Sequence, residues 1–237
     1  MTGTAVLRLL VSFLLLGILA CGSPQQGVSQ GEELESDEID ERANEPAPGL
    51  LIPALAREQA PESFRVEFQT TKGSFVIEAV REWAPNGVDR FYNLVKVGFF
   101  SDVAFYRVVE GFIAQFGVHG DPEINALWAE ATFPDDGAGQ SNLRGTVSFA
   151  QGGPNSRTTQ LFVNLVDSPI LDETGFVPIG RVIEGMENID RIYAGYGEPG
   201  PKKGKGPIPT LLNKSGNSYL RKLFPEMDYI ETAVLVQ

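Results

Sequence analysis

The chain has 237 residues with 31 acidic and 19 basic side chains, a formal net charge of −12, and 42% of its residues are hydrophobic. This is enough for one packed domain with appendages, while the charge argues against a nucleic-acid-binding protein, which needs a basic face. One cysteine and one histidine exclude disulfides within the chain, a Cys/His zinc site and nucleophile systems that need more than His119, so we expect neither metal nor other cofactor.

The first twenty residues have the pattern of an export signal. Arg8 precedes an apolar run from Leu9 to Leu19, about eleven residues, which suits a signal peptide and is shorter than the ~20 residues of a membrane-spanning helix. The next signal, Ile18-Leu19-Ala20-Cys21, resembles a bacterial lipobox, in which the cysteine is diacylated and becomes the new N-terminus. An ordinary signal peptide or a short uncleaved anchor is the alternative.

Cys21 is the only cysteine of the chain, and its position favours the lipoprotein interpretation. Two or three acyl chains would anchor the protein firmly where a single chain would not. Residue 22 is Gly rather than Asp, which in a Gram-negative host resembles the pattern sent on to the outer membrane. We therefore expect residues 1–20 to be a lipoprotein signal peptide, and the protein to be lipid-anchored in the cell envelope, on the periplasmic face of the outer membrane.

Residues 21–61 are predicted to form an acidic, disordered tether. Their composition shifts to Gln, Ser, Gly, Pro and carboxylates, with Arg42 and Arg57 as the only bases. Such a segment buries too little apolar surface to offset its ordering entropy, and its like charges extend it. An acidic recognition tail is the alternative. The folded domain is expected over residues 62–237.

Two strands and a helix are expected to open this domain. Apolar and polar residues alternate over 64–68 and 75–79, and Thr71-Lys72-Gly73 supplies a turn, which predicts an antiparallel hairpin. Pro85 then stands at a helix start, apolar residues follow at helical spacing, and Gly98 is the stop.

The segment Phe105–Gly117 reads F-Y-R-V-V-E-G-F-I-A-Q-F-G. On a strand edge, Arg107 would by default lay its stem along apolar surface and hold its charge in water. The following segment, Gly120–Leu143, is predicted to be loop-like because of its prolines and glycines, with Trp128 as a loop anchor rather than a platform for a ligand. Asp135-Asp136-Gly137 suggests calcium only weakly, because the spaced ligands and closing Glu of an EF-hand are missing.

The segment Gly145–Asn164 reads G-T-V-S-F-A-Q-G-G-P-N-S-R-T-T-Q-L-F-V-N and predicts a strand, a loop and a strand. Residues 146–150 and 160–163 suit short strands. Gly152-Gly153-Pro154-Asn155 forces a loop between them, because glycine and asparagine tolerate positive φ. Taken alone, this is a hairpin that any β protein could contain.

The rest of the chain supplies two helices and a strand. Ile170–Gly180 reads I-L-D-E-T-G-F-V-P-I-G, and an amphipathic helix is predicted over Met186–Tyr193. Gly197–Pro209 contains three lysines among glycines and prolines, which is more typical of a solvated loop than of a phosphate site. A short helix from Tyr219 to Phe224 and a strand near Tyr229–Val236 would complete the domain.

Three of these segments resemble signatures of the cyclophilin family of peptidyl-prolyl isomerases. Gly145–Asn164 is similar to S-M-A-x-x-x-P-x-x-x-x-S-Q-F-F-I, Phe105–Gly117 to F-H-R-I-I-x-G-F-M-x-Q-G-G, and Ile170–Gly180 to W-L-D-x-x-x-V-V-F-G. The first two are independent signatures, in the right order and about the right distance apart. The resemblance implies a mainly β fold, a closed eight-stranded antiparallel cyclophilin-like barrel capped by two helices.

The resemblance also implies the site. Arg107 would be catalytic together with Phe112 and Gln115, and Gln115 would position Arg107 or the substrate carbonyl. The backbone of Gln151 would pair with the residue before proline. The implied substrate-binding residues are Ile113, Ala150, Gln151, Gln160, Phe162, Leu171 and Phe176.

The sequence departs from the family pattern twice. Ile170 stands where many eukaryotic members carry Trp, and Phe176 aligns, across a one-residue insertion, with the usual His. Both residues keep the site apolar, so the departures affect drug binding and substrate preference more than catalysis. The apolar set could equally be barrel core, and for Phe149 and Leu161 that is the preferred interpretation.

The expected function is a peptidyl-prolyl cis-trans isomerase that assists the folding of exported proteins. Its partners would be proline-containing, unfolded or partly folded polypeptides, and we expect a monomer. The alternative is a proline-peptide-binding module or chaperone of the same fold with little or no turnover, which the presence of Arg107, Phe112, Gln115 and Phe162 disfavours only in part. An unrelated all-β lipoprotein would require two ordered signatures to be coincidence, and we reject it.

Overall fold

The computed structural model describes residues 46–137, 139–200 and 204–237. The predicted signal peptide, the lipidation site Cys21 and the tether as far as residue 45 lie outside the described residues. In the part of the chain that the structure describes, no helix is long and apolar enough to cross a membrane.

The strands form one antiparallel sheet of nine members in the order β3-β9-β1-β2-β8-β6-β7-β5-β4. The predicted first hairpin is confirmed, with Val66 opposite Ile77 and Phe68 opposite Phe75. The predicted strand, loop and strand of 145–164 is a second hairpin, β6–β7, with Val147 opposite Val163. The strands are β1 (Ser63–Thr70), β2 (Phe75–Val80), β3 (Val103–Ala104), β4 (Arg107–Val109), β5 (Ile113–Phe116), β6 (Thr146–Phe149), β7 (Leu161–Asn164), β8 (Pro178–Glu184) and β9 (Tyr229–Val236).

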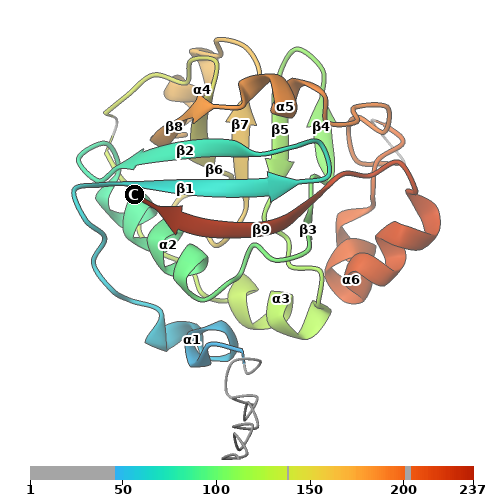
Figure 1. Cartoon of the computed structure of the whole chain (residues 1–237), viewed down its shortest axis with the longest axis horizontal. Coiled ribbons are helices and arrows are strands. Elements are labelled where there is room, and N and C mark those ends of the chain that lie inside the picture. The colour runs from blue at the N-terminus through green and yellow to red at the C-terminus, as the bar shows by residue number, and fades with distance from the viewer. Residues whose placement is uncertain (1–45, 138, 201–203) are drawn as a thin grey trace, which may run out of the picture. The chain divides into compact units, whose positions relative to one another are not determined.

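The two ends of this order, β3 and β4, follow one another along the chain. Only Phe105 and Tyr106 separate them, so one bent segment pairs with β9 through its first half and with β5 through its second. This segment brings the two edges of the sheet together (Figure 1). Counted as one strand, it gives the eight-stranded barrel that the family resemblance implied.

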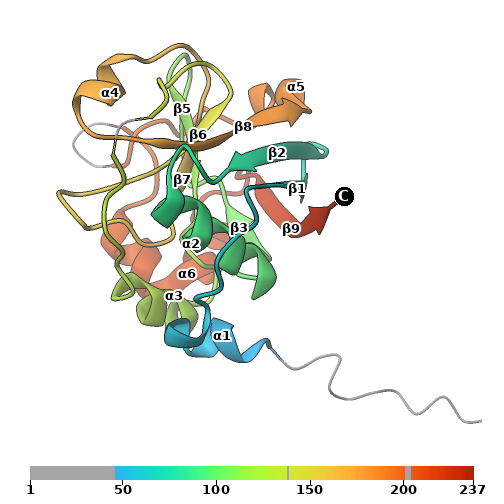
Figure 2. The ribbon, with the colours of Figure 1, turned by 90° about the vertical axis from the view of Figure 1, so that its left-hand side faces the viewer.

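Two of the longer helices cover the barrel. α2 (Pro85–Lys96) packs against β8 and β9 (Figure 2). Its residues Val88, Phe91 and Leu94 are completely buried. α6 (Pro209–Leu223) forms a second apolar cluster, in which Leu212 and Leu220 pack with Tyr106 of the bent segment. The other helices are α1 (Pro48–Leu51), the 3-10 turn η2 (Pro53–Leu55), α3 (Pro122–Ala129), α4 (Ile170–Glu173) and α5 (Met186–Asp190).

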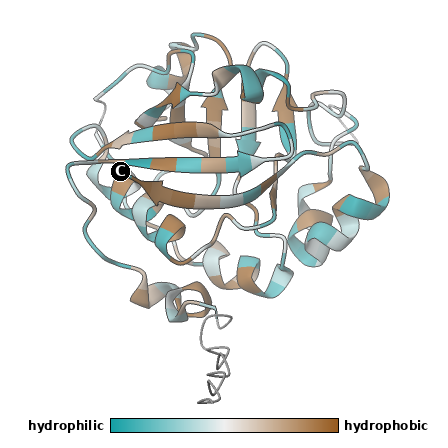
Figure 3. Cartoon of the chain, in the orientation of Figure 1, coloured by the Kyte–Doolittle hydropathy of each residue, from teal (hydrophilic) through white to brown (hydrophobic). Residues whose placement is uncertain are grey.

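The barrel core is built from aromatic rings. Phe68 stacks on Phe75 with their ring centres 4.9 Å apart, and it also contacts Phe91, Phe100 and Phe116. Apolar and polar residues alternate along β1, as the colours of Figure 3 show, because successive side chains of a strand point to opposite faces. The alternation read from the sequence therefore fixes which face of the hairpin is buried.

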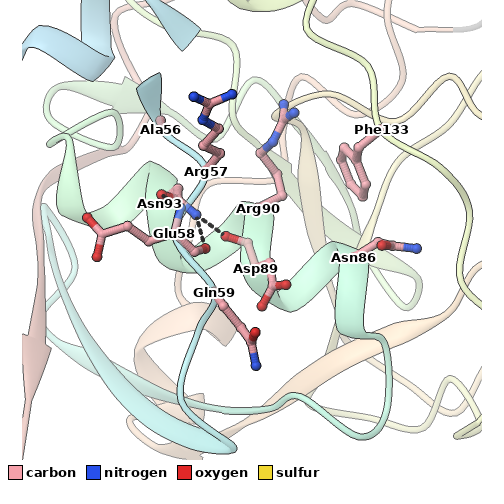
Figure 4. A pocket seen from close by; sticks show the side chains of 9 residues that line it. All are labelled: Ala56, Arg57, Glu58, Gln59, Asn86, Asp89, Arg90, Asn93 and Phe133. Carbon is pink, nitrogen blue, oxygen red and sulfur yellow. Dashed lines mark hydrogen bonds between the residues drawn. The ribbon is translucent and has the colours of Figure 1, made fainter. Parts of the chain in front are cut away.

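Residues 46–61 correct the predicted tether, because they are folded as a strap against α2 and α3. The indole N–H of Trp128 donates to the carbonyl of Leu50 at 2.9 Å. Asn93 of α2 donates to the carbonyl of Glu58 at 2.7 Å and accepts from its N–H at 2.9 Å (Figure 4). The N–H of Ala60 donates to Asp89 at 2.9 Å. The predicted disorder is wrong here because a short apolar run in the acidic segment finds partners on the barrel.

The segment Gly120–Leu143 was predicted to be loop-like, yet it begins with the helix α3. Asp121 caps this helix by accepting from the N–H of Glu123 at 2.8 Å, and Pro122 occupies the first turn. Trp128 is fully buried on α3 against Phe99, so it anchors the segment as predicted, but from a helix.

Two further boundaries differ from the prediction. The helix expected over Tyr219–Phe224 is the end of α6, which begins at Pro209 and is bent at Gly216, where φ is +52°. A Cβ atom at Gly216 would lie 1.9 Å from the carbonyl oxygen of Gly120, so only glycine fits this close approach. Because Gly216 interrupts the helical pattern, the sequence did not predict the first half of α6. α5 ends at Asp190, before the predicted Tyr193.

Candidate active site

A cavity of about 300 Å³ opens beside β4, β5 and β7. It contains residues that lie far apart in the sequence. The strand order places β4, β5, β7 and β6 next to one another, and the segments that follow β6 and β7 in the chain supply the remaining lining residues. Its lining residues are Arg107, Phe112, Ile113, Gln115, Ala150, Gln151, Phe162, Leu171 and Phe176. The structure therefore brings together every predicted site residue of the folded domain except Gln160.

Among the described residues, Arg107 is the only charged side chain that lines the cavity. Its guanidinium is held on two sides: Nε and Nη2 donate to the two carboxylate oxygens of Glu198 at 2.9 and 2.7 Å, and Nη1 donates to Oε1 of Gln115 at 2.9 Å. Cζ of Arg107 also lies 5.9 Å from the ring centre of Phe112. One hydrogen on each terminal nitrogen is left without an acceptor among the described residues.

Glu198 is a site residue that the sequence analysis missed. It lies in the predicted lysine-containing loop, where nothing in the composition marks it. Backbone hydrogen bonds clip the loop near it, since the N–H of Gly206 donates to the carbonyl of Glu198 at 3.0 Å and Gly197 bridges to Val108 of β4. Both members of the ion pair are partly buried, with 21% of the Arg107 side chain and 32% of the Glu198 side chain exposed. Partial burial protects such a pair from salt screening.

A short polar network lies behind the arginine. Nε2 of Gln115 donates to the hydroxyl of Tyr106 at 2.5 Å, and this hydroxyl donates to Oε1 of Gln160 at 2.5 Å. Burial raises the pKa of Tyr106, so the hydroxyl stays protonated and able to donate. Gln160 therefore faces this network and a neighbouring hollow rather than the main cavity.

The apolar wall of the cavity is braced from outside. The rings of Phe162 and Phe176 meet edge to face with their centres 5.5 Å apart, and Asn142 donates to the carbonyl of Phe176 at 2.7 Å. Asn142 also donates to Asp172 of α4, as does Ser141. Burial opposes ionisation of Asp172, but these hydrogen bonds outweigh it and hold its pKa below the ordinary value.

Gln151 places an acceptor beside the cavity. Its Nε2 donates to the carbonyl of Thr174 at 3.1 Å, while its Oε1 is buried without a hydrogen-bond partner among the described residues. An unpartnered buried acceptor costs about 1–3 kcal/mol.

Asp135 and Asp136, which the sequence suggested only weakly as calcium ligands, hold the loop from Gly152 to Arg157 in place. Arg157, whose side chain is 3% exposed, pairs with Asp135 and Asp136 at 3.1 Å each. Asp135 also exchanges two hydrogen bonds with Asn155. Across the described residues, no group of three side chains suited to a metal ion is present. These aspartates tie the glycine-rich loop to the rest of the barrel.

Three other side chains singled out from the sequence lie away from the cavity. Ile170 is 60% exposed on α4 and does not line it. Phe149 and Leu161 are buried in the barrel core, as preferred from the sequence.

The fold and the cavity together are those of a cyclophilin, a closed antiparallel barrel with one arginine beside an apolar pocket. Residues 64–208 match the family model described as cyclophilin type peptidyl-prolyl cis-trans isomerase/CLD. The fold agrees with the crystal structure of a Cryptosporidium parvum cyclophilin type peptidyl-prolyl cis-trans isomerase, with a TM-score of 0.54 and 22% identity over 74% of this chain and 98% of that one.

Two similar proteins are also named as peptidyl-prolyl cis-trans isomerases. Peptidyl-prolyl cis-trans isomerase ppi1 of Schizosaccharomyces pombe is 34% identical over 133 residues, 54% of this chain and 83% of that protein. Peptidyl-prolyl cis-trans isomerase B of Escherichia coli is 30% identical over 135 residues, 54% of this chain and 82% of that protein. The chain belongs to the cyclophilin-type family, and it is a peptidyl-prolyl cis-trans isomerase.

Proposed function

We propose that the cavity takes the proline ring of a polypeptide and that Arg107 stabilises the twisted X-Pro amide. Rotation about this bond is slow because the nitrogen lone pair is delocalised into the carbonyl, which gives a barrier of about 18–20 kcal/mol. A site lowers the barrier if it binds the twisted amide better than either planar isomer, and no nucleophile is needed. On twisting, the nitrogen becomes basic and accepts a hydrogen bond that the planar amide nitrogen does not.

The observation that carries the proposal is a single fixed cationic donor beside an otherwise uncharged pocket. Glu198 and Gln115 hold the guanidinium before any substrate arrives, so little reorganisation accompanies the reaction. The two remaining hydrogens of Nη1 and Nη2 can reach the proline nitrogen and the preceding carbonyl, which a planar guanidinium does better than an ammonium group. Phe112, Phe162 and Phe176 supply the dry surface for the pyrrolidine ring.

Small proline peptides are the first substrates to test. The Cryptosporidium parvum relative was also crystallised in the presence of the dipeptide Ala-Pro. Exchange of cis and trans X-Pro signals in NMR, or a protease-coupled assay, measures turnover directly for the domain that begins with the strap. Binding of such peptides without acceleration of exchange would support the alternative, a peptide-binding module of the same fold.

We further propose that the protein works in the cell envelope on exported polypeptides, held there by a lipid at Cys21. The support is the lipobox-like Ile18–Cys21 and the presence of no other cysteine in the chain. Cys21→Ser is expected to leave the protein soluble or unprocessed, because acyl chains supply the membrane affinity. Mass spectrometry of the mature N-terminus measures this, and an unmodified peptide that begins elsewhere than residue 21 would contradict the assignment.

We expect ordinary isomerase activity but only weak inhibition by cyclosporin. In cyclosporin-binding members the Trp indole packs on the drug and donates a hydrogen bond, whereas Ile170 offers an exposed apolar contact and no donor. The unpaired acceptor on the drug costs about 1–3 kcal/mol. Titration of wild type and Ile170→Trp in one assay should show tighter inhibition of the variant. Equal inhibition of the two proteins would show that Ile170 is not the determinant.

A further inference from the structure

A second hollow of about 270 Å³ adjoins the proline cavity, since Arg107 and Gln115 line both. Its other walls come from the bent segment, from one residue just after β5 and one just before β7, and from the loop and helix that follow α5. They are Tyr106, Val118, Gln160, Pro199, Pro209, Leu212 and Asn213. The hollow therefore depends on α6 and the loop before it.

The chemistry of this hollow suits an apolar guest. Tyr106, Val118 and Leu212 are buried, and Pro199 and Pro209 add apolar walls. The polar atoms at its base satisfy one another, because Gln115 donates to Tyr106 and Tyr106 donates to Gln160. Among the described residues, no charge other than that of Arg107 lines the hollow, and Glu198 already pairs with Arg107. An apolar guest would therefore cover these walls without depriving the paired polar atoms at the base of their partners.

We infer that this hollow is a second substrate subsite, which takes an apolar side chain of the same polypeptide whose proline enters the first cavity. The inference rests on the proposed function of that cavity. Two sites that share Arg107 and Gln115 as walls lie within reach of neighbouring residues of one extended peptide, which advances about 3.3 Å per residue. Discrimination between substrates would then come from α6 and the loop before it, while Arg107 supplies the rate.

Peptides that keep one X-Pro core and change one flanking residue at a time test the inference. The two positions before the core and the two positions after it are each set in turn to Ala, Leu, Phe, Asp or Lys. KM and kcat are measured by NMR exchange. At one of these positions Leu and Phe should lower KM about tenfold relative to Ala with little change in kcat, because the extra apolar surface is bound equally in ground and transition states.

The variant Pro209→Glu assigns the preference to the hollow. Pro209 is exposed at the first position of α6, where a carboxylate suits the helix N-terminus and the fold. The charge should remove the preference for Leu over Ala and create one for Lys at the same position. Thr210→Glu is the matched control, because it adds the same charge one residue further along α6 at an exposed position outside the hollow, and it should behave like wild type.

The outcomes separate this inference from the proposed function. Turnover of every peptide with no dependence on flanking residues, or a preference that Pro209→Glu and Thr210→Glu change equally, would overturn the subsite and leave the isomerase mechanism intact. Absence of turnover with all peptides would overturn the proposed mechanism itself. If Pro209→Glu changes the preference from Leu to Lys and Thr210→Glu does not, the result supports the subsite.

Discussion

Arg107→Ala is expected to lower kcat/KM about 10²–10³-fold while the domain stays folded. Loss of one preorganised charged donor has this effect in comparable electrostatic sites. Arg107→Lys keeps the charge but loses the planar fork, so it should recover only a small part of the rate. Peptide exchange by NMR measures the rates, and circular dichroism with thermal melting shows whether the fold persists. A folded Arg107→Ala protein with near-normal turnover would refute the assignment.

Glu198 provides a control for this experiment. Arg107→Ala leaves the Glu198 carboxylate partly buried without its main partner, which could disturb the loop independently of catalysis. The double variant Arg107→Ala/Glu198→Ala removes that disturbance. If Glu198 acts through Arg107, the double variant should be no slower than Arg107→Ala alone, and the single variant Glu198→Ala should lose a smaller factor. Additive losses would instead mean that Glu198 contributes separately.

Asp136→Asn is expected to destabilise the domain strongly for a conservative change in a loop. Its carboxylate, 2% exposed, pairs with the buried Arg157 and accepts from the N–H groups of Asn86 and Gly87 at the start of α2, at 2.8 and 2.9 Å. Arg157 keeps its pair with Asp135, but an amide in place of the Asp136 carboxylate cannot serve Arg157 and both backbone N–H groups, and lost hydrogen bonds to a charged group cost about 1.5–3 kcal/mol. For a chain of this size, that should lower Tm by roughly 5–10 °C.

Calorimetry or thermal circular dichroism measures this loss, and Asp190→Asn is the matched control. Asp190 also pairs with an arginine, Arg144, but both side chains are more than two-fifths exposed. Such surface pairs contribute about 0–1 kcal/mol. Equal shifts in Tm for the two variants would show that burial of the Arg157 pair does not matter.

The sequence predicted well those parts of the fold in which local pattern and packing agree. Alternation gave the β1–β2 hairpin, and the glycine-rich turn between two apolar runs gave β6–β7. The site could be predicted because its arginine, glutamine and aromatic side chains lie on short segments with a recognisable order of residues. What brings those segments together is the strand order, which the resemblance supplied and the residue pattern alone did not.

The sequence predicted poorly those parts that depend on contacts between distant segments. Residues 21–61 as a whole have a composition typical of disorder, which concealed the short apolar run of the strap, and the strap is ordered by Trp128 and Asn93 of helices elsewhere in the chain. The first half of α6 was hidden by Gly216, whose conformation is required by contact with Gly120. Glu198 is an acid in a loop of glycines, prolines and lysines, and only the folded structure shows that it faces Arg107.

The strap also determines how the domain responds to mechanical force. α1 lies at one end of the barrel and α4, which carries Leu171 of the cavity, at the other (Figures 1 and 2). A pull on the chain before residue 46 would therefore load first the contacts of Leu50 with Trp128 and of Glu58 with Asn93. These few hydrogen bonds would break one after another, and the strap would peel away before tension reached β1. The isomerase site at the far end would keep its shape under loads that strip the strap.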